Sequence, residues 1–427
     1  MSDKKIKLLT LGDHPFSPSG VGGQTKLMIE GLLETGKYSV ISLGGALKHP
    51  DPQPVNVEKW GGDWKIFPVG GKNNTDIFGT PEIVRSILRT ERIDVVWIMT
   101  DPRWWKWLWQ IEDEIRAHAP IVYYHVWDNY PYPQYNKVFY NSNDTIVTIS
   151  KLTSDIVKNV APDVPEVYLP HTVDTNVFKK FDEEEVEKFR ASSLGEEYKD
   201  KMLFFWNNRN ARRKMSASVL WWFKEFLDEV GEDNAAMIMH TDPTDPHGTD
   251  LPAVLEDLGL TNGQIMLSTM KYSPEHLAML YNMVDCTINI ADAEGFGLST
   301  LESLACETPI IVNLTGGLQE QVTDGEAWFG IGIEPSSKAI IGSQQVPYIY
   351  EDRVSREDVL SAFHQIYNME KSERRKLGMF GRQHVLNNYG YENFCKQWDT
   401  IISEVHEKFG SWETRQGYSR WELREVS

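Results

Sequence analysis

Residues 293–302 read AEGFGLSTLE and directly follow the short apolar run Cys286–Ile290. The run predicts a buried strand, and the glycine-rich loop after it predicts a helix over about 298–305. Two glycines leave backbone N–H groups uncovered where this helix begins, and the positive end of its dipole favours an anion there. Glu294 in the loop and Glu302 on the helix can face one ligand at different depths. Amides for phosphates and carboxylates for hydroxyls together predict a site for a nucleotide sugar.

The chain opens on a similar unit. Ile6–Leu11 predicts a strand, Gly12–Gly23 a loop rich in glycine and proline, and Gln24–Leu33 a helix. Gly22 and Gly23 let a phosphate or a sugar approach the backbone closely, although a tight turn without a ligand has the same pattern. The usual dinucleotide fingerprint is absent from this loop, which argues against a nicotinamide site.

Strands and helices alternate along the rest of the chain. In the first part, strands are expected at Tyr38–Leu43, Asp94–Met99, Ile121–His125 and Thr145–Ser150, and helices at Pro81–Thr90, Trp104–Ala117 and Thr153–Asn159. After a charged helical stretch, strands are expected at Met202–Trp206, Ala235–His240, Gln264–Leu267, Cys286–Ile290 and Thr308–Val312. Such alternation predicts parallel sheets covered by helices, and 427 residues are too many for one core. We therefore expect an α/β protein with domains at 1–178 and 179–395.

Composition excludes several classes of protein. Hydrophobic residues make up 41% and charged residues 25%, as in ordinary globular proteins, and no apolar run is long enough to span a membrane. The 43 basic and 62 acidic residues give a net charge of −19, which argues against non-specific binding to nucleic acid or anionic membrane. Three cysteines without metal-ligand spacing, and an N-terminus without a secretory signal, predict a cytoplasmic protein with no stable membrane insertion.

A basic segment, NNRNARRK at residues 207–214, follows one of the predicted strands. It is similar to the Gly-Arg-x4-Lys motif of retaining GT-B glycosyltransferases, the large glycogen-synthase-like and mannosyltransferase-like family, with Asn208 in place of the glycine. Glu-x7-Glu around Gly-Phe-Gly-Leu at 294–302 and Gly-Gly-Leu-x-Glu-x-Val at 316–322 resemble two further motifs of that family. The resemblance covers nearly the whole chain and is most specific from 209 to 322.

The resemblance implies a GT-B architecture, in which two Rossmann-like domains face each other across a cleft. It also implies that the last helix and tail, 396–427, cross back to the first domain. The activity implied is transfer of a sugar from a nucleoside-diphosphate sugar to an acceptor hydroxyl with retention of the anomeric configuration. The sequence has no Asp-x-Asp metal signature, so cationic side chains and helix-start amides would neutralise the diphosphate without a metal.

The residues implied for this activity fall into three groups. Those for catalysis are Glu294 and His125, the latter at a predicted strand end. Those for the donor diphosphate are Arg209, Lys214, Gly22, Gly23, Gly297 and Leu298. Those for the donor sugar and ribose are Glu294, Gly295, Phe296 and Glu302. A packed histidine and a solvated basic loop are the structural alternatives for His125 and for residues 207–214.

Aromatic residues are concentrated in two stretches that predict an acceptor site. The apolar residues at helical spacing, expected in the core, are Trp104, Leu108, Ile111 and Ile115. A second row and a proline-stiffened loop supply Trp105, Trp109, Trp127 and Tyr130. These four could stack on an acceptor sugar or an unpaired base, contact a membrane interface or another subunit, or add to the core.

The stretch 328–353 is longer than in most of the family and resembles an insertion in bacteriophage-encoded members. A phage-encoded enzyme would act in the host cytoplasm, and its acceptor could be a hydroxylated base in DNA as well as a glycan or a small molecule. A UDP-sugar is favoured as the donor, a GDP-sugar is the alternative, and no further cofactor is implied. Two other functions stay open, a nucleotide-sugar epimerase and a non-catalytic protein that binds nucleotides or carbohydrates.

Overall fold

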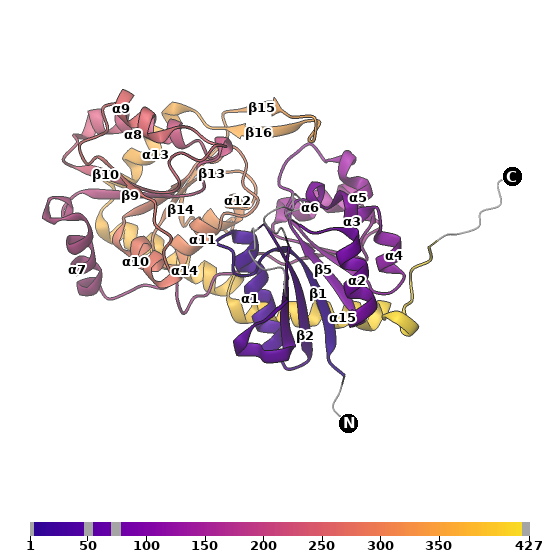
Figure 1. The fold of residues 1–427 in the computed structure, drawn as a ribbon. Coiled ribbons are helices and arrows are strands. Elements are labelled where there is room, and N and C mark those ends of the chain that lie inside the picture. The colour runs from indigo at the N-terminus through magenta and orange to yellow at the C-terminus, as the bar shows by residue number, and fades with distance from the viewer. Residues whose placement is uncertain (1–3, 47–53, 70–77, 421–427) are drawn as a thin grey trace. The chain divides into compact units, whose positions relative to one another are not determined.

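The chain forms two compact units in a computed structural model that describes residues 4–46, 54–69 and 78–420 (Figure 1). The first unit consists of residues 1–172 and 391–427, and the second of residues 173–390.

These boundaries differ from the expected ones at 178 and 396, and local contacts explain why. The Gln24 side chain makes two hydrogen bonds with the backbone of Thr172. Its Nε2 donates to the Thr172 carbonyl oxygen at 2.8 Å, and its Oε1 accepts from the Thr172 N–H at 3.0 Å. The chain therefore stays on the first unit as far as Thr172. It returns at Tyr391, the first residue of the last long helix.

The first unit is built on an eight-stranded sheet with the order β3-β4-β2-β1-β5-β6-β7-β8, in which all neighbours are parallel except β3 and β4. Its strands are β1 (Ile6–Asp13), β2 (Tyr38–Gly45), β3 (Val55–Asn56), β4 (Trp64–Pro68), β5 (Val95–Met99), β6 (Ile121–His125), β7 (Thr145–Thr148) and β8 (Glu166–Tyr168). Its helices are α1 (Gly20–Glu34), α2 (Pro81–Glu91), α3 (Lys106–Trp109), α4 (Glu112–Arg116), α5 (Lys137–Asn141), α6 (Lys151–Val160) and α15 (Tyr391–Phe409). The parallel α/β architecture predicted for this part is confirmed.

Helix α15 completes the core of the first unit although it comes last in the chain (Figure 1, yellow). It packs along α1, and its Trp398 is fully buried. The Trp398 ring makes T-shaped contacts with Trp97 in β5 and Tyr124 in β6, with ring centroids 5.9 Å and 5.0 Å apart. Buried aromatic contacts of this kind contribute more than their area alone, so α15 is integral to this unit.

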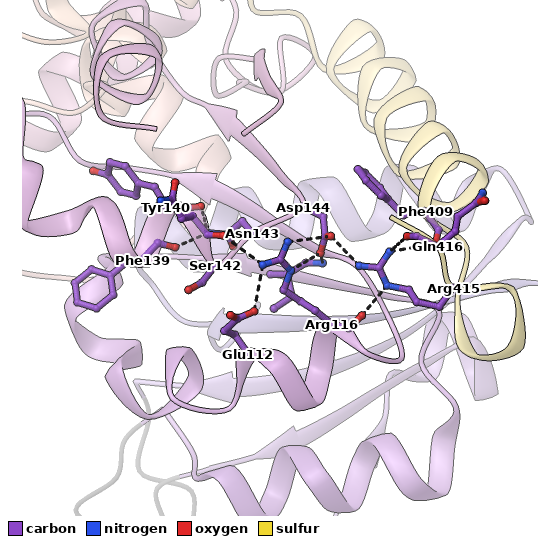
Figure 2. Close-up of polar contacts among 12 residues, drawn as sticks. Glu112, Arg116, Phe139, Tyr140, Ser142, Asn143, Asp144, Phe409, Arg415 and Gln416 are labelled. Atoms are coloured by element: carbon purple, nitrogen blue, oxygen red, sulfur yellow. Dashed lines mark hydrogen bonds and ion pairs between the residues drawn. The ribbon is translucent and has the colours of Figure 1, made fainter. Parts of the chain in front are cut away.

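The segment after α15 also belongs to the first unit, and one buried carboxylate holds it (Figure 2). Arg116 Nε donates to Asp144 Oδ2 at 3.1 Å, and Arg415 NH2 donates to Asp144 Oδ1 at 2.8 Å. Arg415 Nε also donates to the carbonyl oxygen of Arg116 at 2.7 Å. Residues 410–420 therefore anchor the C-terminal end of the described chain to α4 and to the residue just before β7.

The second unit has a six-stranded parallel sheet with the order β11-β10-β9-β12-β13-β14. Its strands are β9 (Met202–Asn207), β10 (Ala235–His240), β11 (Ile265–Ser268), β12 (Cys286–Asn289), β13 (Ile310–Asn313) and β14 (Gly330–Ile333). Its helices are α7 (Glu183–Leu194), α8 (Ser216–Val230), α9 (Leu251–Asp257), α10 (Pro274–Met283), α11 (Leu298–Ala305), α12 (Leu318–Val322), α13 (Arg356–Asn368) and α14 (Lys371–Asn388). The strand order reverses between β9 and β12, and parallel sheets bind ligands at the carboxyl ends of strands at such a point.

The stretch 328–353 contains β14 and then an antiparallel hairpin of β15 (Ser337–Ile341) and β16 (Ile349–Arg353). The hairpin forms a two-stranded sheet of its own, outside the six-stranded sheet (Figure 1). It interrupts the βα alternation of the second unit.

Two predicted helices differ from those observed. Helix α1 begins at Gly20, because Ser19 caps it by accepting from the N–H of Gly22 at 3.0 Å. The helix expected over 104–117 is divided into a 3-10 turn at Pro102–Trp105 and the short helices α3 and α4. Among the residues that the structure describes, no helix combines the length and the apolar character needed to cross a membrane.

Candidate active site

The predicted donor residues of the second unit lie in loops at the carboxyl ends of two neighbouring strands. β9 leads through the basic segment 207–214 into α8, and β12 leads through residues 290–297 into α11. Because β9 and β12 pair in parallel, the two loops leave the same edge of the sheet. A backbone bond joins them directly, from the N–H of Asp292 to the carbonyl oxygen of Arg213 at 2.8 Å.

Lys214 and Glu294 form an ion pair between these loops. Lys214 Nζ donates to Glu294 Oε2 and, at 2.9 Å, to Asn208 Oδ1. Asn289 Nδ2 also donates to Glu294 Oε2, at 3.4 Å. The two charged side chains are only 9% and 11% exposed, so each depends on the other for compensation of its charge. The structure thus unites two residues that the sequence placed in different roles.

Glu302 is held by a chain of hydrogen bonds from a third element. Tyr281 of α10 donates its hydroxyl to Glu302 Oε2 at 2.8 Å, and Asn207 Nδ2 donates to that hydroxyl at 2.8 Å. Burial raises the pKa of Glu302 to about 7, while the Tyr281 hydrogen bond acts in the opposite direction. The carboxyl is therefore close to half ionised at neutral pH. Sequence reasoning missed Tyr281 and Asn207, since nothing local links them to Glu302.

The glycine loop before α11 is fixed by a second glycine turn. Gly297 has φ +92° at the start of the helix, a conformation that favours glycine. The N–H of Gly317 donates to the carbonyl oxygen of Glu294 at 3.1 Å. A Cβ at Gly316 would lie 1.7 Å from that same oxygen, and one at Gly317 would lie 2.7 Å from Cα of Phe296. The predicted Gly-Gly-Leu turn therefore supports the backbone that carries Glu294.

Arg209 does not join Lys214 as a second cation in this structure. Its Nε donates to Asp245 Oδ2 at 2.6 Å, and its NH2 lies 2.8 Å from His247 Nδ1. The Arg209 guanidinium holds the pKa of the Asp245 carboxyl well below its usual range. Arg213 is the arginine beside Glu294, with its NH1 3.8 Å from Oε2. Arg209, expected to bind the diphosphate together with Lys214, is thus bound to a carboxylate from a later loop, and Arg213 is the arginine next to the Lys214–Glu294 pair.

The predicted glycine site of the first unit lies within α1. Gly22 and Gly23 belong to its first turn, not to the preceding loop. A Cβ at Gly22 would lie 2.2 Å from Ser17 Oγ, whereas one at Gly23 would meet no atom within 4 Å. Of the two, only Gly23 leaves space beside the backbone for a ligand.

His125 is completely buried, which contradicts the expected direct contact with a sugar. Its Nε2 lies 2.7 Å from the Tyr140 hydroxyl. Burial lowers its pKa to about 3, so the ring is neutral at physiological pH. The alternative of a packed histidine describes this residue in the structure.

Most of the predicted acceptor aromatics are also core residues. Trp105 and Trp109 are buried, and Trp109 Nε1 donates to the carbonyl oxygen of Pro102 at 2.8 Å. Trp104, expected in the core, is instead half exposed. Asp101 and Pro102 start a 3-10 turn here, so the side chains do not follow the phase of one continuous helix. The stacking platform predicted from Trp105 and Trp109 is therefore wrong.

The remaining two aromatics lie in the loop after β6. Trp127 is buried, donates to the carbonyl oxygen of Asn129 at 3.1 Å, and has the Arg103 guanidinium 5.4 Å from its ring centroid. Tyr130 is only partly buried and donates to Asp155 Oδ2 at 3.0 Å. Of the four predicted acceptor aromatics, Tyr130 retains a partly accessible polar end.

Comparisons with known proteins match parts of the chain to glycosyltransferases. Residues 250–359 match the family model described as "Glycosyl transferases group 1". Over 77 residues the chain is 39% identical to D-inositol 3-phosphate glycosyltransferase of Acidothermus cellulolyticus, covering 18% of this chain and 17% of that protein. Over 284 residues it is 24% identical to alpha-1,3/1,6-mannosyltransferase ALG2 of Dictyostelium discoideum, covering 61% of each. The chain thus spans less than two thirds of the length of either relative.

Solved structures resemble nearly the whole chain. Sucrose-phosphate synthase of Thermosynechococcus elongatus has a TM-score of 0.73 at 15% identity, over 95% of this chain and 100% of that one. Anabaena Alr3699/HepE in complex with UDP-glucose has a TM-score of 0.68 at 14% identity, over 93% and 99%. At these identities the likeness establishes the fold and confirms the two Rossmann-like domains. Residues 250–359 therefore resemble the group 1 glycosyl transferases, within a chain that has the GT-B fold.

Proposed function

We propose that this protein transfers a sugar from a nucleoside-diphosphate sugar to an acceptor hydroxyl with retention of the anomeric configuration. The observation that carries the proposal is the Lys214–Glu294 ion pair beside the start of α11, with Glu302 about one turn along that helix. Cation, helix-start amides and carboxylates are the groups that a diphosphate joined to two sugars requires. A UDP-sugar is the favoured donor, with a GDP-sugar as the alternative, because the Anabaena relative of this fold was solved with UDP-glucose.

The donor diphosphate is assigned to Lys214 and to the amides of Gly297 and Leu298. These groups neutralise the charge that develops on the leaving phosphate, so the scheme uses no metal ion. Arg213 supplies the second cation from its position beside Glu294. Arg209 can contribute only by exchanging Asp245 for the phosphate.

The two glutamates are assigned different parts of the donor. Glu294, with Gly295 and Phe296, accepts from hydroxyls of the transferred sugar, and Glu302 accepts from those of the ribose. In the reaction the bond between the anomeric carbon and the phosphate oxygen breaks. A bond to the acceptor oxygen forms on the same face, and the leaving phosphate takes the acceptor proton. No carboxylate nucleophile is required.

The acceptor is proposed to be a hydroxyl of a glycan or a small molecule. A hydroxylated DNA base, in a phage-encoded enzyme of the host cytoplasm, loses support because Trp105 and Trp109 offer no stacking surface. Tyr130, with its partly buried hydroxyl, is kept as an acceptor contact.

Incubation with labelled UDP- and GDP-sugars tests the proposal. Reactions with no acceptor, with saccharide acceptors, and with unmodified and hydroxymethylated DNA separate the alternatives. A transferred label with the donor's anomeric configuration supports a retaining transferase. Free epimerised nucleotide sugar without acceptor would indicate an epimerase, and binding without any turnover would indicate a non-catalytic protein.

Two substitutions test the assigned roles. Glu294→Ala should lower kcat with little change in donor Kd, whereas Glu302→Ala should mainly weaken donor binding. Donor Kd from calorimetry and kcat from initial rates distinguish the two effects. Unchanged kinetics in both variants would remove the site assignment.

A further inference from the structure

The hairpin β15–β16 is attached to the donor loops through buried charge. Much of the hairpin is exposed, including Ile340 at 72%, so its strands bury little apolar surface of their own. The end of β16 is different, because Glu351 is 1% exposed. A carboxylate buried to this degree needs cationic partners.

Glu351 has two such partners. The Arg212 guanidinium binds both of its oxygens, with NH1 3.0 Å from Oε2 and NH2 on Oε1. Arg353 NH2 donates to Oε2 at 2.7 Å. Arg212 belongs to the basic segment and lies two residues before Lys214, so the hairpin holds the loop after β9.

Arg353 extends the network to the loop after β12. Its NH1 lies 3.3 Å from Asp292 Oδ2. Asp292 is buried, and neither of its carboxylate oxygens accepts a hydrogen bond from a described residue, so Arg353 is its compensating charge. The N–H of Asp352 also donates to the carbonyl oxygen of Asp292 at 2.9 Å. Asp292 lies two residues before Glu294, so the hairpin holds this loop as well.

The loop after β13 is the third one that the hairpin binds. Thr315 Oγ1 donates to Asp352 Oδ2 at 2.7 Å. Asn313 Nδ2 donates to the carbonyl oxygens of Asp352 and Ala291, at 3.0 Å and 2.9 Å. Thr315 directly precedes the glycine turn that supports the Glu294 backbone. One strand end therefore contacts the three loops that carry Lys214, Glu294 and their support.

We infer that Glu351 is a positioning residue of the donor site, through which the inserted hairpin fixes Lys214 and Glu294 relative to each other. This role rests on the proposed transferase function. Glu351 itself is bonded to Arg212 and Arg353, and it acts on the reacting sugar only through the loops these arginines hold. Glu302 is held separately by Tyr281, so the assigned ribose contact does not depend on the hairpin, and donor binding depends on the hairpin only through Lys214.

Glu351→Gln keeps the volume and removes the charge that binds two arginines. We expect kcat to fall about 10- to 100-fold, as for a displacement of reacting groups near 1 Å, with donor Kd within about threefold of wild type. Glu334→Gln, at an exposed glutamate just before the hairpin, is the matched control and should change neither. A kcat within about twofold of wild type, or an equal loss in Kd and kcat, would overturn the inference.

Amide hydrogen exchange tests whether the hairpin holds these loops, and it does not require an activity measurement. The amides of Asp292, bonded to the loop after β9, and of Asp352, bonded to the loop after β12, should exchange faster in Glu351→Gln and not in Glu334→Gln. Arg353→Lys, which keeps the charge but loses the two-pronged contact, should show the same pattern to a smaller degree if Glu351→Gln does not fold. Unchanged exchange in the variants would overturn the inference that the hairpin holds these loops. Absence of sugar transfer by wild type, with the exchange pattern as expected, would instead refute the proposed function alone.

Discussion

Glu302 is expected to make donor binding depend on pH near neutrality. Burial raises its pKa from the ordinary 4.5 to about 7. A ribose hydroxyl donates more strongly to a carboxylate than to a neutral acid, so a bound donor selects the ionised form. With a pKa of about 7, roughly a tenth of the molecules are ionised at pH 6 and roughly nine tenths at pH 8. Donor Kd should therefore be about tenfold lower at pH 8 than at pH 6, which is about 1.4 kcal/mol.

Isothermal titration calorimetry with UDP-glucose at these two pH values measures the effect. The intact sugar nucleotide is preferred to free UDP, whose terminal phosphate titrates with a pKa of about 6. Glu302→Gln should bind with a Kd that is nearly independent of pH, whereas Glu326→Gln, at an exposed glutamate, should behave as wild type. Burial also raises the pKa of Asp292, to about 6, so Asp292 is a second group that could titrate in this range. The Asp292→Asn variant should keep most of the pH dependence of donor Kd. An equal change of donor Kd with pH in wild type and in Glu302→Gln would refute the assignment of Glu302 to the ribose.

The same carboxyl can be tested without a donor. Because its pKa is higher in the folded than in the unfolded chain, the native state binds the proton more tightly. The stabilisation is complete below about pH 4.5 and is lost as the pH rises through about 7, on the order of 3 kcal/mol for this one group. Urea unfolding of wild type and Glu302→Gln should therefore give free energies whose difference changes with pH in this direction.

Three further predictions concern the same loops. Gly317→Ala places a Cβ 2.7 Å from Cα of Phe296 and should lower kcat/KM about 100-fold, whereas Gly62→Ala, with no atom within 4 Å, should have no effect on initial rates. Lys214→Met leaves the Glu294 carboxylate without its ammonium partner and should lower the free energy of unfolding by about 3 kcal/mol, measured in urea. Adding Glu294→Gln should restore most of that loss, and no restoration would argue against a coupled pair. Sugar transfer should persist in EDTA, and a loss that a divalent metal reverses would disprove the metal-free scheme.

Local sequence signals predicted an element well where the residues that determine it all lie in one short stretch. Helix α11 runs from Leu298 to Ala305, as expected from Gly297 and the apolar residues after it. β12 covers Cys286–Asn289, close to the predicted run. Each element depends on residues that are neighbours in the chain, and alternation of such elements then defines the α/β class.

The contacts of the site depend on residues far apart in the chain, which one sequence cannot pair. Arg209 is bound by Asp245, and Glu302 by Tyr281, although no spacing links them. His125 is buried because Tyr140 covers its ring, not because of anything at the strand end itself. The sequence therefore identified which side chains gather at the strand ends, but not which of them compensate each other.

The return of the chain to the first unit has a consequence for biosynthesis. Residues 173–390 are contiguous, so the second unit can fold as soon as it has left the ribosome. The first unit must wait, because Trp398 fills its core and Arg415 neutralises Asp144. The part synthesised first is thus completed last, and a nascent chain that stalls before residue 391 would leave Trp97 and Tyr124 uncovered for chaperones to bind.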